Sequence, residues 1–194
     1  MSGKVLIVGG SVVREYDSTA QPRLLTTTIT QAEIATLEGD RYSAQADFTL
    51  ANGGIQYLQF TMPSILSQKV SGFIFRDIKS SDGIDFDLFW EPTGMVKGNS
   101  IPIFNENQLS PKNPQTEYTL VTSVTTEGVI RESNFSIPGQ GNRGLSGEIN
   151  PATGYRVYAP DSVALLKIEN TSSSTNRVLI TYSWVESPIS LGGE

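Results

Sequence analysis

The chain has 194 residues, no cysteine, no histidine and a formal net charge of −6. Without these two residue types it cannot form disulfides, thiolate nucleophiles, Cys/His zinc sites or a Ser-His-Asp triad. The acidic balance argues against binding to a phosphate backbone, and no run of eighteen apolar residues is present, so we expect neither a nucleic-acid partner nor a membrane partner.

The N-terminal region starts with an apolar run, Val5 to Val8, that is followed by two glycines. A dinucleotide-binding unit would need a third glycine and then a helix, and the Thr-, Ser- and Pro-rich residues 12–30 provide neither. We therefore predict an N-terminal arm over residues 1–29 with one short strand. Because the apolar run has no helix to pack on, we expect the arm to dock on a neighbouring protein rather than on its own body.

One helix is predicted, from Thr30 to Gly39. Thr30 can cap its start, Glu33 occupies the matching position of a capping box, and Gly39 can close its end. Ile34 and Leu37 share one face. A helix of two turns does not hold alone, so we expect it to dock on a sheet.

From residue 42 onward the pattern changes to short runs of period two, separated by turn residues, which is typical of β-strands. The residues Asn52-Gly53-Gly54 predict a turn into a returning strand, and Gly72 predicts a bulge. Pro102 places the strand at 99–104 at a sheet edge. Residues 129–137 are predicted to pair with the strand at 118–124, and residues 138–147 to form a glycine-rich loop.

Two further strands lie between Asp161 and Glu186. About nine short strands with almost no helix predict an all-β fold, an antiparallel β-sandwich of jelly-roll type over residues 30–188, with a flexible tail at 189–194. Leu165, Leu166 and Ile168 give one of the closing strands apolar residues on both faces. We therefore expect a subunit contact to cover one of these faces.

Several groups of residues were considered as sites. Asp82, Asp85 and Asp87 form the densest carboxylate group, but the spacing of a calcium loop is missing, which favours a turn residue followed by the solvent face of a strand. Pairing them with Glu91 for glycoside hydrolysis has no other support in a chain with 20 acidic residues. Residues 139–144 lack the lysine of a phosphate-binding loop and no helix follows, so a surface loop is the better interpretation.

Aromatic residues at alternating strand positions could stack on sugars, although such positions more often belong to a core. Two glycosylation triplets, which start at Asn134 and Asn170, carry no function without secretion. We therefore predict no catalytic, cofactor-binding or metal-binding residue, no cofactor, and no enzymatic activity. The aromatic residues considered are Tyr57, Trp90, Tyr155, Tyr158, Tyr182 and Trp184.

Two passages carry a family resemblance. The first is Leu-Phe-Trp-Glu-Pro-Thr-Gly at 88–94, followed by the Asn-rich segment 98–107. The second is Leu-Leu-Lys-Ile-Glu-Asn-Thr-Ser at 165–172, followed by Ile-Thr-Tyr-Ser-Trp-Val-Glu at 180–186. In these passages the chain resembles small bacteriophage virion proteins, which are described as head-decoration, minor structural or tail-associated proteins.

The resemblance implies a structural component of a bacteriophage particle, in the first place a head decoration or cement protein. A tail or fibre-anchor component and a carbohydrate- or receptor-binding adhesin module are the alternatives. It implies that the protein assembles with itself, as a trimer, and with the major capsid protein or with tail or portal proteins. It also implies synthesis in the host bacterial cytoplasm and a place in the virion.

Overall fold

The structure of the chain is a computed structural model that describes the backbone of residues 5–8, 11–15, 24–28, 31–64, 69–137, 145–148 and 156–188. Side chains are described for residues 33–64, 77–131, 136 and 158–186. The elements are β1 (Val5–Val8), β2 (Ser11–Glu15), β3 (Leu24–Thr28), α1 (Gln31–Glu38), β4 (Arg41–Leu50), β5 (Ile55–Thr61), β6 (Lys69–Ser80), β7 (Ile84–Trp90), β8 (Val96–Ser100), β9 (Ile103–Asn105), β10 (Glu117–Ser123), β11 (Val129–Ile137), β12 (Leu145–Glu148), β13 (Arg156–Tyr158), β14 (Val163–Asn170) and β15 (Asn176–Pro188).

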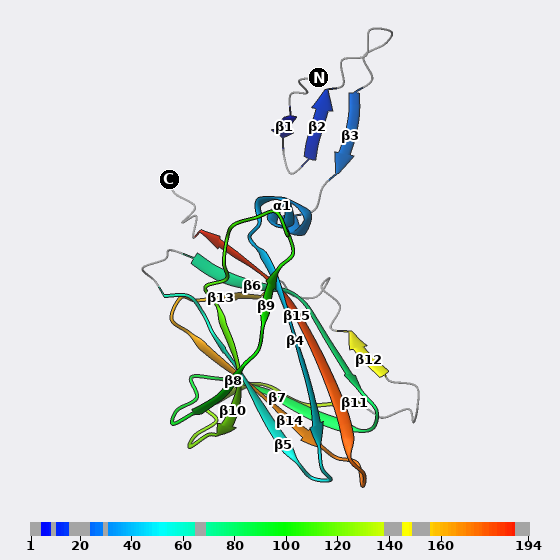
Figure 1. Cartoon of the computed structure of the whole chain (residues 1–194), viewed down its shortest axis with the longest axis vertical. Helices are drawn as coiled ribbons and strands as arrows, with labels where there is room; N and C mark the ends of the chain where they lie inside the picture. The colour runs from blue at the N-terminus through cyan, green and yellow to red at the C-terminus, as the bar shows by residue number, and fades with distance from the viewer. Residues whose placement is uncertain are drawn as a thin grey trace.

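Two antiparallel sheets pack face to face and form the body (Figure 1). The sheet named here the β14 sheet has the order β11-β7-β14-β5-β10-β8, and the β15 sheet has the order β12-β6-β15-β4-β9, with β13 also paired to β6. Each sheet has one of the two predicted closing strands near its middle. The orders β4-β15-β6-β12 and β5-β14-β7-β11 are those of a jelly roll, so the predicted fold class is confirmed.

The turns between many successive strands lead from one sheet into the other. The residues Asn52-Gly53-Gly54 do form a turn, with a φ of 65° at Gly53, but β5 leaves it to pair with β14 instead of returning along β4. The prediction of a hairpin at this turn was therefore wrong. A turn signal specifies that the chain reverses, and it does not specify which neighbour the next strand pairs with. The closing strands β14 and β15 are likewise joined by a corner and lie in different sheets.

Other pairings also differ from the prediction. Residues 129–137 pair with β7, because β10 already has β5 and β8 as neighbours. The strand predicted at residues 99–104 is divided between β8 and β9, and Pro102 lies between the two strands. Both strands lie at the edges of their sheets, so the predicted edge position is confirmed. The predicted glycine-rich loop is shorter than expected, because residues 145–148 form β12. A bulge follows Gly72 as predicted: Phe73 and Phe75 pair with adjacent residues of β15, and Ile74 is the extra residue.

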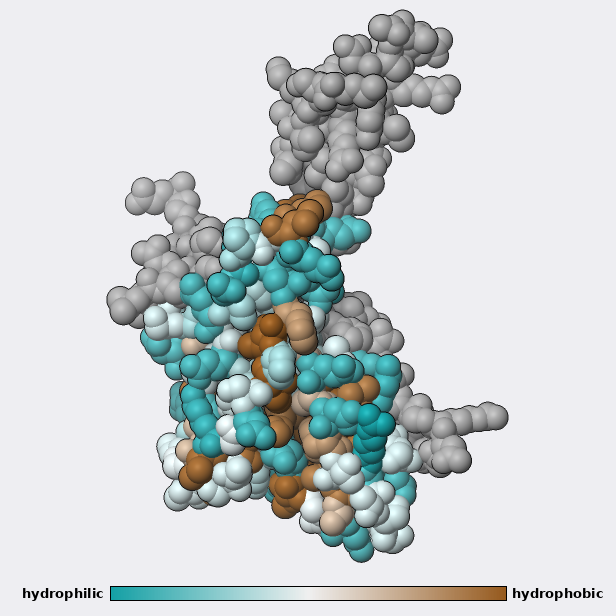
Figure 2. All heavy atoms as spheres, viewed as in Figure 1, coloured by the Kyte–Doolittle hydropathy of each residue, from teal (hydrophilic) through white to brown (hydrophobic). Residues whose placement is uncertain are grey.

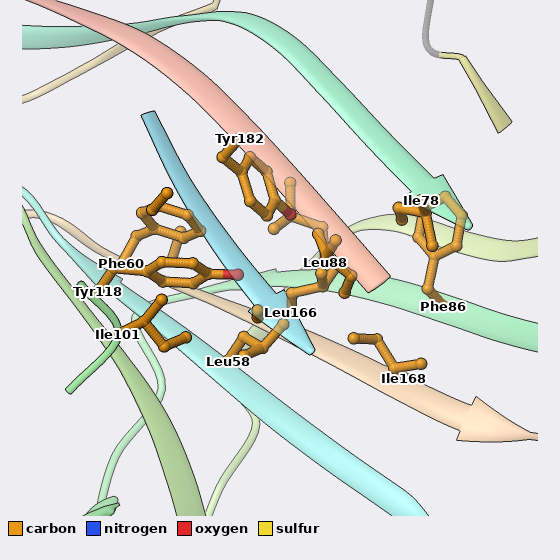
Figure 3. Close-up of a cluster of buried hydrophobic side chains, with 14 of the residues drawn as sticks. Leu58, Phe60, Ile78, Phe86, Leu88, Ile101, Tyr118, Leu166, Ile168 and Tyr182 are labelled. Carbon is orange, nitrogen blue, oxygen red and sulfur yellow. The ribbon is translucent and has the colours of Figure 1, made fainter. Parts of the chain in front are cut away.

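The core lies between the two sheets and contains the residues that the alternating pattern had placed on one face (Figure 3). Phe60 is at its aromatic centre, stacked on Tyr118 at 4.1 Å and edge-on to Tyr182 at 4.6 Å. Ring pairs with this geometry stabilise a core by about 0.5–1.5 kcal/mol beyond the burial of their area. Aliphatic side chains from β5, β6, β7 and β14 fill the remainder, among them Leu58, Ile78, Leu88, Leu166 and Ile168.

A second apolar cluster covers part of the outer face of the β14 sheet. Phe89, Val121 and Leu165 are buried there, beneath Met95 and Val124 from the segments that flank β8 and follow β10. Leu165 has no exposed surface in the single chain. The expectation that this face of β14 needs a subunit contact was therefore wrong, because residues distant in the sequence already cover it.

Two buried asparagines join the corners at one end of the sandwich. The Asn170 side-chain amide donates to the carbonyl oxygens of Leu50, Ala51 and Ser174 at 3.2, 2.8 and 2.7 Å. Asn176 accepts from the backbone nitrogen of Asp82 at 3.1 Å, in the corner between β6 and β7. The three connections that lead from one sheet to the other at this end are thereby joined by one hydrogen-bond network, named here the corner knot. This network satisfies backbone groups that would otherwise be buried without partners.

At the opposite end, α1 lies beside β4 (Figure 1). It ends as predicted: Gly39 has a φ of 74°, and its amide and that of Asp40 donate back to carbonyl groups of the helix. Among the side chains of this helix that the structure describes, that of Ala35 is buried, whereas Leu37 is 65% exposed. The prediction that the face of the helix with Leu37 docks on the sheet was therefore wrong for Leu37, because the small Ala35 lies against the body. The proposed cap Thr30 lies outside the described residues.

The described residues of the N-terminal region form three strands where the sequence predicted one. β1, β2 and β3 form an antiparallel sheet that, among the described strands, pairs with neither sheet of the body, and in Figure 1 it lies beyond α1. Among the described residues, no helix is long and apolar enough to cross a membrane.

Candidate functional site

The three aspartates considered as metal ligands do not converge. Asp82 lies in the corner before β7, where its carboxylate accepts a hydrogen bond from the Ser174 hydroxyl at 3.1 Å. Asp85 and Asp87 alternate with the core residues of β7 and so lie on its outer face, where Asp85 accepts a hydrogen bond from Ser136. Within the described residues there is no group of three or more potential ligands that could hold a metal ion.

Glu91 follows the end of β7 and is exposed. At about 3.3 Å per residue along a strand, Asp87 is about 13 Å away from it and Asp85 about 20 Å away. These are separations of backbone positions, and for Asp85 the separation is well beyond the roughly 5–9.5 Å that glycoside hydrolysis requires between two carboxyl groups. Asp85 and Glu91 therefore do not form such a pair.

Most of the aromatic residues considered for sugar stacking belong to the core. Trp184 has no exposed surface, Tyr182 is 4% exposed, and Trp90 stacks on the buried Tyr158 with ring centroids 4.7 Å apart. Tyr155 and the loop 139–144 lie outside the described residues, as does the side chain of Asn134. Asn170 is buried in the corner knot and cannot accept a glycan.

Tyr57 is the exception, because it borders a groove on the β14 sheet. Its hydroxyl donates to Glu127 at 2.7 Å, and Lys167 lies 3.4 Å from the same carboxylate oxygen. Burial, and then the bond to Glu127, raise the pKa of Tyr57 to about 12. The groove has a volume of about 330 Å³ and is lined by neutral residues of β5, β8 and β10, including Gln56 and Asn99.

The most strongly anchored polar group is Glu186, which has no exposed surface. Its carboxylate accepts hydrogen bonds from the backbone nitrogens of Gln115, at 2.9 and 3.1 Å, and of Thr116, at 2.9 Å. Trp184 donates to it through Nε1 at 3.2 Å. A buried carboxylate without such donors would be costly, so the residue fixes the end of the loop at 106–116.

The same loop is tied down along its length. Asn105 donates to the carbonyl oxygens of Gly39 and Lys112 at 2.9 and 3.0 Å. Asn107 donates to the carbonyl oxygen of Leu37 at 3.0 Å and accepts from the amide of Leu109 at the same distance. The loop is thereby held against the C-terminal end of α1 (Figure 1).

Apolar side chains are exposed on this fixed loop and on the two elements beside it, α1 and β9. Leu109 is 94% exposed, Leu37 is 65% exposed and Phe104, in β9, is 63% exposed. Figure 2 shows apolar surface at this end of the body. We call these three residues, with the loop at 106–110, the loop face. A large apolar side chain held in a rigid, exposed position is typical of an interaction surface.

Comparison of the chain with protein-family models, curated proteins and solved structures gave no match. The structural evidence alone therefore defines the class of protein, a jelly-roll β-sandwich with a separate N-terminal three-stranded sheet.

The anchored loop was not predicted from the sequence. One signal for it was present: Glu186 continues the inward alternation of Ile180, Tyr182 and Trp184, so a carboxylate falls on a core-facing position. A charged residue at such a position predicts a buried group with several donors. No sequence pattern identifies its donors, because Gln115 and Thr116 are about seventy residues away in the chain.

Proposed function

We propose that the protein is a non-enzymatic structural component of a bacteriophage particle, most specifically a head decoration or cement protein. The observation that carries the proposal is the loop face, where buried polar groups hold an outward-facing apolar surface in place. A protein that works by burying surface against neighbours needs such preformed contacts on a rigid scaffold.

The fold is compatible with this function. Jelly rolls occur in viral capsid proteins, and they also occur in lectins and cupins, so the fold by itself does not define an activity. The two passages that resemble phage virion proteins form β7 with its following turn, β8 and β9, and then β14 and β15. They belong to the scaffold and to the start of the fixed loop.

The partners that follow are other copies of the chain, as a trimer, and the major capsid protein or proteins of the tail or portal. The net charge of −6 suits an outer surface better than contact with packaged DNA. The proposed location is the virion.

The experiment is the analysis of purified particles of the phage that encodes the chain. We expect mass spectrometry to find the protein in gradient-purified particles at a fixed copy number, and gold-labelled antibody to mark the head. Label on the tail would favour the tail or fibre-anchor alternative. Absence of the protein from particles, when it is present in the lysate, would contradict the proposal.

The groove beside Tyr57 supports a second candidate, a carbohydrate-binding adhesin module. Its lining combines an aromatic ring with amide and hydroxyl side chains and has no charged residue, which suits a neutral sugar. Titration with neutral oligosaccharides from the host surface tests it. We expect Tyr57→Ala to abolish any binding and Leu109→Ala, at the other end of the body, to leave it unchanged.

A further inference from the structure

We propose that the loop face is the docking site for the N-terminal sheet, β1 to β3, of a neighbouring copy of this chain. The inference rests on the proposed self-assembly and goes further by naming both surfaces of the contact. Two features of the molecule support the contact: an N-terminal sheet that is separate from the body, and an exposed apolar surface on the body.

The first feature is the N-terminal sheet. Among the described strands it pairs with neither sheet of the body. The sequence of β1 is Val-Leu-Ile-Val, and successive residues of a strand alternate between its faces. All four residues of β1 are apolar, and packing apolar residues against another element stabilises a small sheet.

The second feature is the loop face itself. Leu109 is 94% exposed although its loop is fixed by hydrogen bonds, so the exposure does not result from a loosely held segment. With Leu37 and Phe104 it offers apolar contacts that nothing in the described part of the chain covers. An apolar sheet face is the kind of surface that these side chains can bury.

The charges of the two surfaces are complementary. Residues 1–28 hold three of the 14 basic residues and two of the 20 acidic ones, which leaves 11 basic and 18 acidic residues for the remaining chain. The loop face contains the exposed Glu106 and lies beside the exposed Glu38, while the nearby Lys112 is paired with Asp40. A weakly basic, apolar sheet thus meets an apolar surface with an acidic border, which favours docking over repulsion.

The short connection between the sheet and the helix favours a neighbouring copy over the same chain. β3 ends at Thr28 and α1 begins at Gln31, so two residues join them, and they reach about 10 Å at most. Leu37 lies near the far end of α1, which at about 1.5 Å per residue is about 12 Å long. The sheet of the same chain is therefore tethered at the first turn of α1 and would have to fold back along the helix to reach Leu37, whereas the sheet of a neighbour has no such tether.

Photocrosslinking tests the contact directly. Leu109 is replaced by benzoylphenylalanine, and chains carrying light and heavy nitrogen isotopes are mixed before irradiation. We expect crosslinks from position 109 to residues 5–28 of a differently labelled chain. The matched control places the same group at Asn99, which is exposed on β8, and should give no such crosslinks. Crosslinks within one chain only, or to other regions, would overturn the proposal.

Sedimentation of the full-length chain gives an independent measurement. We expect Leu109→Asp to raise the concentration needed for self-association at least tenfold, and Val96→Asp, an equally polar change at an exposed residue of β8, to change it less than twofold. Self-association that is insensitive to Leu109→Asp would overturn this contact and leave the proposed function intact. A wild-type chain that remains monomeric at every concentration would also overturn it, whereas the particle analysis tests the proposed function separately.

Discussion

Replacing Glu186 tests whether one buried carboxylate holds the loop at 106–116. Glu186→Ala removes the acceptor of Thr116 N and Trp184 Nε1, both buried, and of Gln115 N. Each buried donor left without an acceptor costs about 1–3 kcal/mol, and the lost methylene groups leave a small cavity. We therefore expect a loss of about 3–5 kcal/mol in the free energy of unfolding.

Glu186→Gln is the matched control, because it keeps the shape of the side chain. An amide oxygen in the place of Oε1 retains the bonds from Thr116 and Trp184, and only the Oε2 bond from Gln115 is lost. We expect this variant to lose about 1 kcal/mol. For a chain of this size the alanine variant should melt about 6–20 °C lower than the wild type.

Urea unfolding measures both variants, and amide hydrogen exchange shows where the structure opens. In Glu186→Ala the amides of Gln115 and Thr116 should exchange faster, because they lose their acceptor, while amides of β14 keep their protection relative to global unfolding. If the alanine variant loses less than about 1 kcal/mol, or no more than the glutamine variant, then the carboxylate does not anchor the loop.

Three further predictions concern the turns, the outer cluster and the tyrosines. Gly128 has a φ of 92°, and a side chain there would meet the carbonyl oxygen of Trp90 at 2.1 Å. Gly128→Ala should therefore lower the free energy of unfolding, measured in urea, by more than about 3 kcal/mol. Gly53 has a φ of 65° and open space around it, so Gly53→Ala should lower the same free energy by about 1–2 kcal/mol. Equal losses in the two variants would contradict the steric argument. Leu165→Ala should lower the free energy of unfolding by about 2–5 kcal/mol without changing the mass found by sedimentation, because the contacts of Leu165 lie within one chain. A loss of self-association in this variant would instead show that this face of β14 belongs to a subunit contact. The pKa of Tyr57, raised to about 12, means that the native state keeps a proton that the unfolded state releases near pH 10. Stability should therefore fall as the pH rises from about 10 to 12, and Tyr57→Phe should make this fall smaller; an unchanged pH profile of unfolding in that variant would contradict the assignment.

The sequence by itself determined most strands of the body and, for many of their residues, the face of the sheet on which each residue lies. The alternation of Ile84, Phe86 and Leu88 with Asp85 and Asp87 depends only on the period of two in an extended chain, and the structure places the apolar set in the core. The end of α1 was also predictable, because a glycine at the position after a helix permits a left-handed backbone that other residues adopt at a cost.

The tertiary structure decided which strands are neighbours and which surfaces remain open. The turn at Asn52-Gly53-Gly54 has the residues of a hairpin, and it becomes a corner because Gly53 and Gly54 bond to the backbone of Asn170, far along the chain. Leu165 was expected to need a partner subunit, and Met95 and Val124 of the same chain cover it instead.

The same reasoning applies to the candidate site. Its anchor, Glu186, is separated by about seventy residues from the donors that hold it, and these donors lie at the end of the loop that displays Leu109. Local patterns report the conformation of a few adjacent residues, since backbone dihedral preferences act over short distances. The burial of a side chain and the partner of a buried charge depend on contacts between distant segments, and these are fixed only when the two sheets pack together.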